Sequence, residues 1–371
     1  MSGKKRTKQN STNPVWLLLG LLLLIGALVG LMVYRSGVLQ GDGEEEDLRK
    51  QTERYVFETG TQQVFADVGG GVAVGSSTGL QILDAEGYTI LRSVVSITTP
   101  AIVSGEDTAV VYDVGGTVLR AGNTDGKVTI LDTEETIISA TMNEAGYLAV
   151  VTEETGYKGK VTVYNAEMEK VYAWHSGTNY VLSARVSPDC KTMVALTLEE
   201  TGSGAHVFSL SSEDEYAAFY APGTLLFDIA FLGNDRLCGI HDGGLVFFTT
   251  AGVEDGSFSF EGRYLAGYSF EGDGFAAVML SQYLSGSAST IITVGYGGSV
   301  TGQLTPEEVP QSVAVRDKQV MIRYGEYTAL YSQSLEETNR LAVAQGGKNA
   351  VFTEKNKGFL IYSGYCEPIT F

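Results

Sequence analysis

Proline, tryptophan, histidine and cysteine are scarce in this sequence, whereas glycine is abundant. Only 7 prolines, 2 tryptophans, 3 histidines and 3 cysteines occur among 371 residues, against 46 glycines. The glycines keep no period of three, which excludes a collagen-like chain. Hydrophobic residues make up 44% of the chain, and this content excludes disorder over most of its length, because enough apolar surface exists to offset the entropy lost on folding.

Basic residues are also few, at 25 against 44 acidic ones, and the formal net charge is −19. A protein this acidic repels phosphate, so we expect no nucleic-acid partner. All 44 acidic residues but only 21 of the basic ones follow residue 33, which gives that part of the chain a charge of −23. Such a domain is also repelled by anionic wall polymers and lipid headgroups.

One long apolar run, Val15–Val33, contains 19 residues and no charge. At 1.5 Å per residue it spans about 28 Å, close to the thickness of a bilayer hydrocarbon core. Four basic residues precede it, which favours a cytoplasmic N-terminus. A cleaved signal peptide is the alternative, but Leu31–Arg35 offers no small-residue cleavage site. We therefore predict a single-pass protein of the cell membrane with four parts: a cytoplasmic basic tail (1–14), a transmembrane helix (15–34), an acidic linker (35–51) and an extracytoplasmic domain (52–371).

Gly26 and Gly30 stand four residues apart within the apolar run. Gly-x-x-x-Gly spacing lets two membrane helices approach closely, so a homodimer through Gly26 and Gly30 is one interpretation. The other is that glycine is simply common in membrane helices and has no pairing role here.

A short apolar unit recurs along the rest of the chain. Its occurrences begin at residues 72, 109, 148, 193, 237, 275, 320 and 359, at intervals averaging 41 residues. Strands are predicted before and after each unit, as in Val181–Val186 and Val161–Asn165, with Asp-Gly, Glu-Gly or Gly-Gly turns between them. Four short antiparallel strands per 40 residues are typical of a β-propeller blade.

We therefore predict an all-β fold over residues 52–371, a β-propeller of eight four-stranded blades. Residues Lys348–Phe371 have room for only three strands, so we expect Arg54–Glu58 to supply the fourth and close the ring. A ring of seven blades is the alternative, if the first or the last repeat is only a cap.

The anchor, the repeats and stretches such as Gly69–Asp84 resemble the uncharacterised membrane-anchored propeller proteins of Gram-positive bacteria. Ser187-Pro188-Asp189-Cys190 is similar to the Ser-Pro-Asp-Gly turn of quinoprotein-like and WD40-like propellers, with cysteine in place of glycine. The resemblance implies a propeller fold and a cell-envelope location. It implies no activity, because the tryptophan-docking motifs of quinoprotein dehydrogenases are absent.

Residues with catalytic or metal-binding chemistry show no recognisable pattern. His175, His206 and His241 have no ligand spacing, although His241 precedes an acid and is either a general base or an exposed turn residue. The serine loops Gly202–Gly204 and Ser285–Ser287 are not nucleophile elbows. We predict no catalytic, cofactor-binding or metal-binding residue.

Cysteines and acidic turns leave further alternatives open. The cysteines Cys190, Cys238 and Cys366 lack metal-motif spacing, and whether two of them form a disulfide is undecided. Asn123–Gly126 and Glu271–Gly274 carry oxygens that suit calcium, but turn chemistry also explains both segments.

Two functions remain. We expect a binding or scaffolding module for envelope proteins or peptides, since propellers present loops on two faces. The alternative is an envelope enzyme or sugar-binding receptor that uses acidic residues at the central channel. A histidine beside inward-facing acids would favour the enzyme.

Overall fold

The computed structural model describes residues 54–58, 60–212, 214–343 and 346–371. The basic tail 1–14, the predicted span 15–34 with Gly26 and Gly30, and the linker 35–51 lie outside the described residues. No helix among the residues that the structure describes is long and apolar enough to cross a membrane. Residues Arg54–Phe371 form one compact unit.

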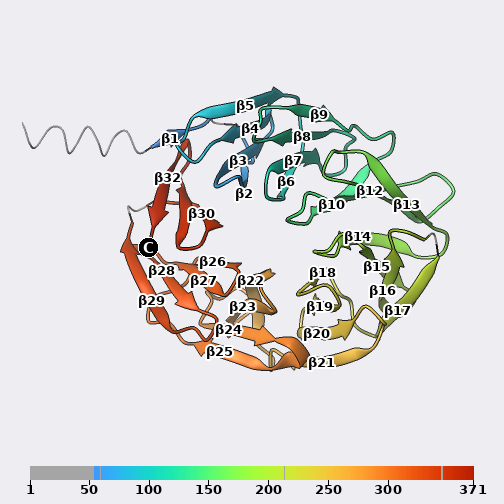
Figure 1. Ribbon diagram of the computed structural model, residues 1–371. Helices are drawn as coiled ribbons and strands as arrows, with labels where there is room; N and C mark the ends of the chain where they lie inside the picture. The colour runs from blue at the N-terminus through green and yellow to red at the C-terminus, as the bar shows by residue number, and fades with distance from the viewer. Residues whose placement is uncertain (1–53, 59, 213, 344–345) are drawn as a thin grey trace, which may run out of the picture. The chain divides into compact units, whose positions relative to one another are not determined.

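Eight antiparallel sheets of four strands each form a ring (Figure 1). The first four blades contain, in order, β2 (Val64–Val68), β3 (Gly71–Ser76), β4 (Gly79–Leu83) and β5 (Thr89–Val94); β6 (Pro100–Ser104), β7 (Thr108–Asp113), β8 (Leu119–Asn123) and β9 (Val128–Ile130); β10 (Ile137–Met142), β11 (Leu148–Thr152), β12 (Gly159–Tyr164) and β13 (Lys170–Ser176); and β14 (Tyr180–Val186), β15 (Thr192–Glu199), β16 (Gly202–Ser209) and β17 (Glu215–Pro222).

The other four blades have the same arrangement, with one 3-10 turn, η1 (Tyr296–Gly298), between two strands. They contain β18 (Asp228–Phe231), β19 (Arg236–His241), β20 (Gly244–Thr249) and β21 (Glu254–Ser259); β22 (Tyr264–Gly272), β23 (Phe275–Ser281), β24 (Thr290–Gly295) and β25 (Val300–Leu304); β26 (Ser312–Arg316), β27 (Gln319–Arg323), β28 (Tyr327–Ser332) and β29 (Glu337–Ala342); and β30 (Asn349–Glu354), β31 (Lys357–Ile361), β32 (Tyr365–Thr370) and β1 (Tyr55–Val56). The prediction of eight four-stranded blades is confirmed, and the seven-blade alternative is wrong.

The repeated apolar units are the second strands of the blades. A second strand is covered on both faces by packed side chains, so it reads as a continuous apolar run without alternation. β3, β11 and β23, for example, are buried over their whole length. Eight apolar clusters, each shared by two neighbouring blades, make up the core of the ring.

The ring closes where the start of the described chain meets its end. β1 adds to β32 in the last blade, with Tyr55 opposite Cys366 and Val56 opposite Tyr365. Phe57 follows this strand and is 3% exposed, in the cluster that joins the last blade to the first. The prediction that Arg54–Glu58 closes the ring is therefore confirmed.

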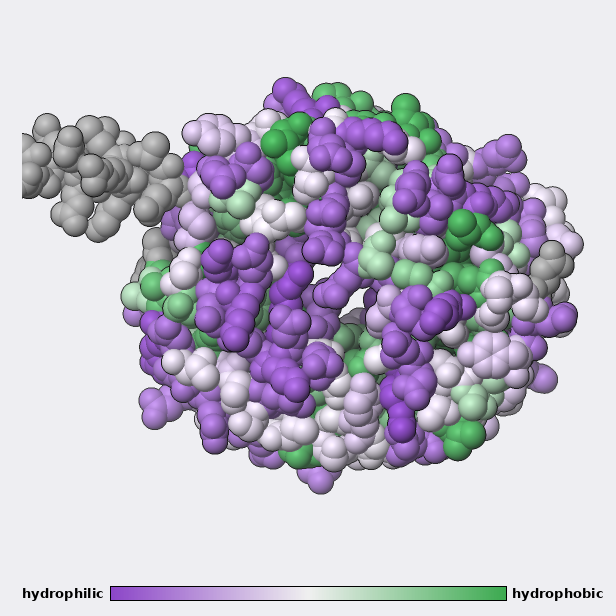
Figure 2. Space-filling model, in the orientation of Figure 1, coloured by the Kyte–Doolittle hydropathy of each residue, from purple (hydrophilic) through white to green (hydrophobic). Residues whose placement is uncertain are grey.

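The first strand of each blade lies innermost, around the centre of the ring (Figure 1). Figure 2 shows an opening through this centre, bordered mainly by hydrophilic residues. We call this opening the channel.

Candidate functional site

At one end of the channel lie the turns between the first and second strands of the blades, and hydrogen bonds link these turns from blade to blade. The bonds are Gly69 N to Glu106 O (2.7 Å), Glu106 N to Glu144 O (2.8 Å), Asn143 Nδ2 to Ser187 O (2.8 Å), Asp189 N to Asn234 Oδ1 (3.1 Å), Asp273 N to Asp317 O (2.7 Å) and Gln319 Nε2 to Asn356 Oδ1 (2.6 Å). Bonds of this kind hold neighbouring turns in a fixed geometry.

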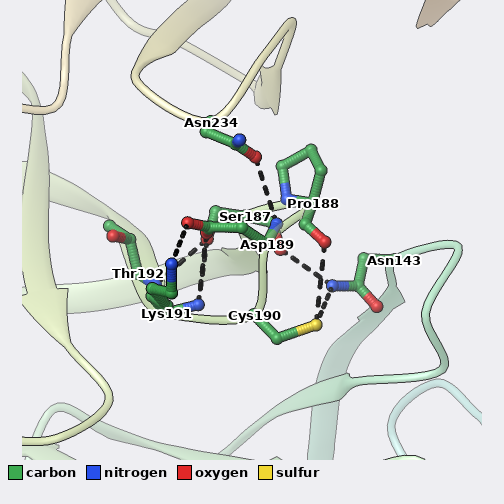
Figure 3. Close-up of polar contacts among 8 residues, drawn as sticks. All are labelled: Asn143, Ser187, Pro188, Asp189, Cys190, Lys191, Thr192 and Asn234. Carbon is green, nitrogen blue, oxygen red and sulfur yellow. Dashed lines mark hydrogen bonds and ion pairs between the residues drawn. The ribbon is translucent and has the colours of Figure 1, made fainter.

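The turn Ser187–Cys190 shows how one blade is tied to both neighbours (Figure 3). Ser187 Oγ accepts the backbone N–H of Thr192 at 3.0 Å, which closes the turn. From the preceding blade, Asn143 Nδ2 donates to Ser187 O and, at 3.3 Å, to Cys190 Sγ. Cys190 has a φ of 59°, the left-handed conformation that glycine usually adopts. The resemblance to a Ser-Pro-Asp-Gly turn thus extends to the backbone.

These turns carry a ring of carboxylates. Seven of the eight blades place at least one exposed acidic residue in or next to this turn, and we call the set the acidic rim. Its members are Glu106, Asp107, Glu144, Asp189, Asp235, Asp273, Asp317 and Glu354. Three lysines in the same turns, Lys191, Lys318 and Lys355, leave the rim strongly negative.

Within the channel, two arginines on the innermost strands are paired with aspartates of other blades. Arg316 of β26 donates to Asp67 of β2 and to Phe352 O of the blade between them. Burial raises the pKa of the Asp67 carboxyl, although the Arg316 charge opposes the rise. The pair therefore links two blades across the one that lies between them.

The second arginine, Arg185 of β14, donates through Nη2 to both carboxylate oxygens of Asp228 of β18, at 3.1 and 3.3 Å. Tyr268 of β22 donates its hydroxyl to the same carboxylate at 3.1 Å. Burial, together with the charge of Asp228, raises the pKa of Tyr268 to about 12. Three consecutive blades are thus joined by one charged network.

Glu271, at the end of β22, differs from these groups because it has no hydrogen bond or ion pair with any residue that the structure describes. Its side chain has a solvent-exposed surface, yet protein surrounds it closely enough for desolvation to raise its pKa. The charge of Asp67 raises this pKa further, and those of Arg316 and Arg185 lower it. Among the described residues of the innermost strands, Glu271 is thus a carboxylate without a hydrogen-bond or ion-pair partner.

Residues 45–370 match the model of a family described as a family of unknown function, DUF5711. The chain belongs to this family. No curated protein matches the chain. The DUF5711 chain is similar in fold to several solved propellers at low identity. The crystal structure of Saccharomyces cerevisiae Sqt1 gives a TM-score of 0.60 at 11% identity, covering 85% of this chain and 98% of that one.

Two further solved structures are similar in fold to the DUF5711 propeller. The C-terminal WD40 domain of Sif2 gives a TM-score of 0.58 at 12% identity, with coverage of 86% and 99%. BamB from Moraxella catarrhalis gives 0.53 at 10% identity, with coverage of 86% and 98%. These likenesses show the WD40-like and BamB-like propeller fold and nothing about activity.

The three histidines lie outside the channel network. His206 on β16 is 8% exposed, with Nδ1 at 2.8 Å from Glu215 and Nε2 at 3.1 Å from Glu199. Its ring stacks on Trp174 of the preceding blade, so it joins the third strand of its own blade, β16, to the outer strand β13 of its neighbour. His175 is on the outer strand β13, where its ring lies beside the carboxylate of Glu154. His241 is the last residue of β19. No histidine therefore accompanies the channel acids.

The three cysteines have structural positions and form no site together. The cysteines Cys190, Cys238 and Cys366 are free and lie in three different blades. Burial raises the pKa of the Cys366 thiol to about 12 and that of Cys238 well above its ordinary value. Neither buried thiol is therefore suited to act as a nucleophile.

The acidic and serine turns are explained by local bonds. Asn123 Oδ1 accepts the N–H of Lys127 at 2.9 Å, which accounts for the Asn123–Gly126 turn. Ser203 Oγ accepts the N–H of Leu226 at 3.0 Å. Among the residues that the structure describes, no three histidine, cysteine or acidic side chains are grouped to hold a metal ion. Of the segments singled out in the sequence, Glu271–Gly274 and the turn Ser187–Cys190 contribute to the channel and its rim, through Glu271, Asp273 and Asp189.

Sequence reasoning missed the paired groups of the channel. Asp67 and Arg316 are 249 residues apart and belong to different repeats, so no local motif joins them. A charged residue within the first strand of a repeat is the signal that was available, because this strand lies innermost.

Proposed function

We propose that this protein is a scaffold that binds basic segments of other proteins on its acidic rim. The observation that carries the proposal is the ring of exposed carboxylates on turns that are hydrogen-bonded to one another. Turns held in this way lose little conformational entropy on binding, which favours affinity. A surface of one charge also steers a partner of opposite charge during the encounter.

The alternative, an enzyme or a sugar-binding receptor, requires acidic residues at the channel, and an enzyme would be favoured by a histidine beside them. Acidic residues lie in the channel, but none of the three histidines lies beside them. Asp67 and Asp228 are engaged by arginines, which leaves Glu271 as the one unpaired carboxylate of this group. A pair of free carboxylates is the usual requirement for glycoside hydrolysis. These contacts favour the scaffold.

The location is part of the proposal. The apolar run 15–34 would anchor the protein in the cell membrane, with 1–14 in the cytoplasm and the propeller outside, in a Gram-positive envelope as the resemblance implies. Dimerisation through Gly26 and Gly30 would place two acidic rims on one anchored complex. Support comes from the sequence alone: the basic flank, the length of the apolar run and the Gly-x-x-x-Gly spacing.

Binding to a basic probe tests the scaffold. The full-length protein in detergent micelles is titrated with a decalysine peptide, and the dissociation constant is measured by fluorescence anisotropy at two salt concentrations. A rim variant carries Glu106→Gln, Asp107→Asn and Asp273→Asn. At about 0.5 kcal/mol for each exposed contact, we expect about tenfold weaker binding.

The matched control removes three exposed acids from turns and connections at the other end of the channel, with Glu134→Gln, Asp242→Asn and Glu261→Gln. Its net charge equals that of the rim variant, so the two differ only in where the charge was lost. Equal weakening in both variants would show nonspecific attraction to an acidic protein and would refute the acidic rim as a docking surface.

The topology is tested by labelling. A cysteine placed at Glu261, whose side chain is 79% exposed, is treated with a membrane-impermeant maleimide on intact cells, in a Cys190→Ser background. We expect labelling before lysis. Labelling that appears only after lysis would show that the propeller faces the cytoplasm.

A further inference from the structure

We propose that Arg323 and Thr328 form a binding site for one small monovalent anion, of the size of chloride, between the seventh blade and the last. Arg323 is the last residue of β27 and is 3% exposed. Thr328 lies directly opposite it on β28 and is fully buried. Residues opposite each other in an antiparallel pair project from the same face of the sheet, so the guanidinium and the hydroxyl leave the blade on one side.

That side of the blade packs against the last blade. Met321 and Leu330 form the next pair on the same face of the hairpin, and both belong to an apolar cluster with Leu360 of β31. Tyr362 lies in this cluster too. Burial raises the pKa of Tyr362 to about 12, while the nearby charge of Arg323 acts to lower it. The guanidinium is therefore enclosed between two blades.

Arg323 has no carboxylate partner among the described residues, although the protein is strongly acidic. The other eight described arginines each form an ion pair with an aspartate or a glutamate. Of these nine arginines, Arg323 is the one that is buried. Arginine keeps its proton in proteins, so its burial without a negative charge leaves a large desolvation cost uncompensated. A bound anion would compensate this cost.

Two polar atoms at this place lack a hydrogen-bond partner. The Arg323 guanidinium donates through Nη1 to Gln311 Oε1, but its buried Nε donates to none of the described residues. The buried Oγ1 of Thr328 also has no partner among them. Buried polar groups are nearly always hydrogen-bonded, so two unsatisfied donors that leave the same face of one hairpin point to a ligand.

Gly347, just before the last blade, keeps one edge of the guanidinium unobstructed. A Cβ on Gly347 would lie 3.1 Å from Arg323 Nη2 and 3.4 Å from Nε. These two N–H groups form the edge with which arginine binds anions in a fork. The backbone of Gly347 is outside the left-handed conformation, so glycine is not needed there for its φ. Its lack of a side chain is what this place requires.

The charge and the burial of the site favour a small monovalent anion. One negative charge neutralises one guanidinium, whereas a divalent phosphate or sulfate would leave a surplus charge buried. A residue that is 3% exposed has little room beside it for an organic acid. Nε and Nη2 of Arg323 and the hydroxyl of Thr328 are three donors, and chloride accepts hydrogen bonds from all such groups.

Thermal unfolding in chloride tests the site. The full-length protein in detergent micelles is melted in mixtures of sodium gluconate and sodium chloride at constant ionic strength, because gluconate is too large to enter. The melting temperature should rise by about 2–4 °C once chloride exceeds its dissociation constant by about ten- to a hundredfold. A melting temperature that does not change as chloride replaces gluconate overturns the proposal.

Variants locate the effect. Gly347→Ala places a Cβ against the guanidinium edge and keeps the arginine, and Thr328→Val removes the hydroxyl but keeps a branched side chain. Both should lose most of the chloride dependence, and Arg323→Gln should lose all of it. The control Arg92→Gln removes an arginine of the first blade whose side chain is 55% exposed. Its change in charge matches that of Arg323→Gln, and its response to chloride should equal that of the wild type.

NMR of the chloride nucleus measures binding without unfolding. Exchange with a protein site broadens the chloride resonance, so the wild type and Arg92→Gln should broaden it equally and Gly347→Ala should broaden it less. This comparison decides the question even if Arg323→Gln does not fold. Equal broadening by the wild type and Gly347→Ala, or an undiminished melting response in both Gly347→Ala and Thr328→Val, would show that chloride binds elsewhere and would overturn the assignment.

Discussion

Replacing Cys190 by glycine should stabilise the propeller, whereas replacing it by alanine should destabilise it. Cys190 is held at a φ of 59° by the turn between β14 and β15. The left-handed conformation costs a residue with a side chain about 1–2 kcal/mol, and glycine avoids this cost. Glycine also loses more backbone entropy on folding, about 0.5–1 kcal/mol relative to alanine, which offsets part of the gain.

The contacts of the thiol decide how much of this gain remains. Asn143 Nδ2 donates to Cys190 Sγ at 3.3 Å, but it also donates to Ser187 O at 2.8 Å, so the amide keeps a strong acceptor in either variant. Sulfur is a weak acceptor, and its loss should cost a few tenths of a kcal/mol. We therefore expect Cys190→Gly to gain up to about 1 kcal/mol, and Cys190→Ala, which keeps the strain, to lose about 0.5 kcal/mol.

Differential scanning calorimetry of the full-length protein measures this pair. With an unfolding entropy of about 2 cal/mol/K per residue, 1 kcal/mol corresponds to roughly 1.5 °C in the melting temperature of a unit this size. The alanine variant is the matched control, because it removes the same thiol without relieving the backbone. A glycine variant that melts below the alanine variant would falsify the strain argument.

One deletion and two substitutions test the packing of the ring. Deleting residues 364–371 removes β32, the partner of β1, and should lower the melting temperature of the whole unit; an unchanged calorimetric transition would contradict ring closure as a source of stability. Arg316→Met leaves Asp67 unpaired and should cost about 1–2 kcal/mol in urea unfolding, less than a fully buried pair because both side chains are about a quarter exposed. The double variant with Asp67→Asn should recover part of that loss, and no recovery would speak against the pairing. His206→Ala removes the shared partner of Glu199 and Glu215, and we expect it to destabilise the protein by about 1–3 kcal/mol. It also removes the ring that stacks on Trp174, so the fluorescence of Trp174 should change. An unaltered fluorescence spectrum would argue against the stacking.

The fold was predictable because its strongest signal is local. The second strand of each blade is covered on both faces, so units such as Val72–Val74 and Phe359–Ile361 appear as short apolar runs between turns. Their spacing of about 40 residues then gives the blade period. Closure by Arg54–Glu58 followed from counting strands in the last repeat, since an incomplete blade requires a strand from elsewhere.

The candidate site was less predictable because its contacts join distant repeats. Arg185 and Asp228 come from consecutive blades, and Asp67 and Arg316 from blades at opposite ends of the chain. The geometry of the ring determines which side chains meet in the channel, and the period of the sequence repeats does not show this geometry. The left-handed backbone at Cys190 was hidden for a different reason, since the residue expected in that conformation is glycine.

The closure of the ring has a consequence for the order of folding during synthesis. Tyr55 is among the first residues of the propeller to be made, yet its carbonyl contacts Cys366, 311 residues later. Until the last blade exists, β1 has no partner, and the apolar cluster between the last blade and the first is incomplete. Contacts this far apart in sequence slow folding, because a long loop must close before they form. A ribosome that stalls before β32 would therefore release an open arc with two unpaired ends, a form that quality-control proteases and chaperones can distinguish from the finished ring.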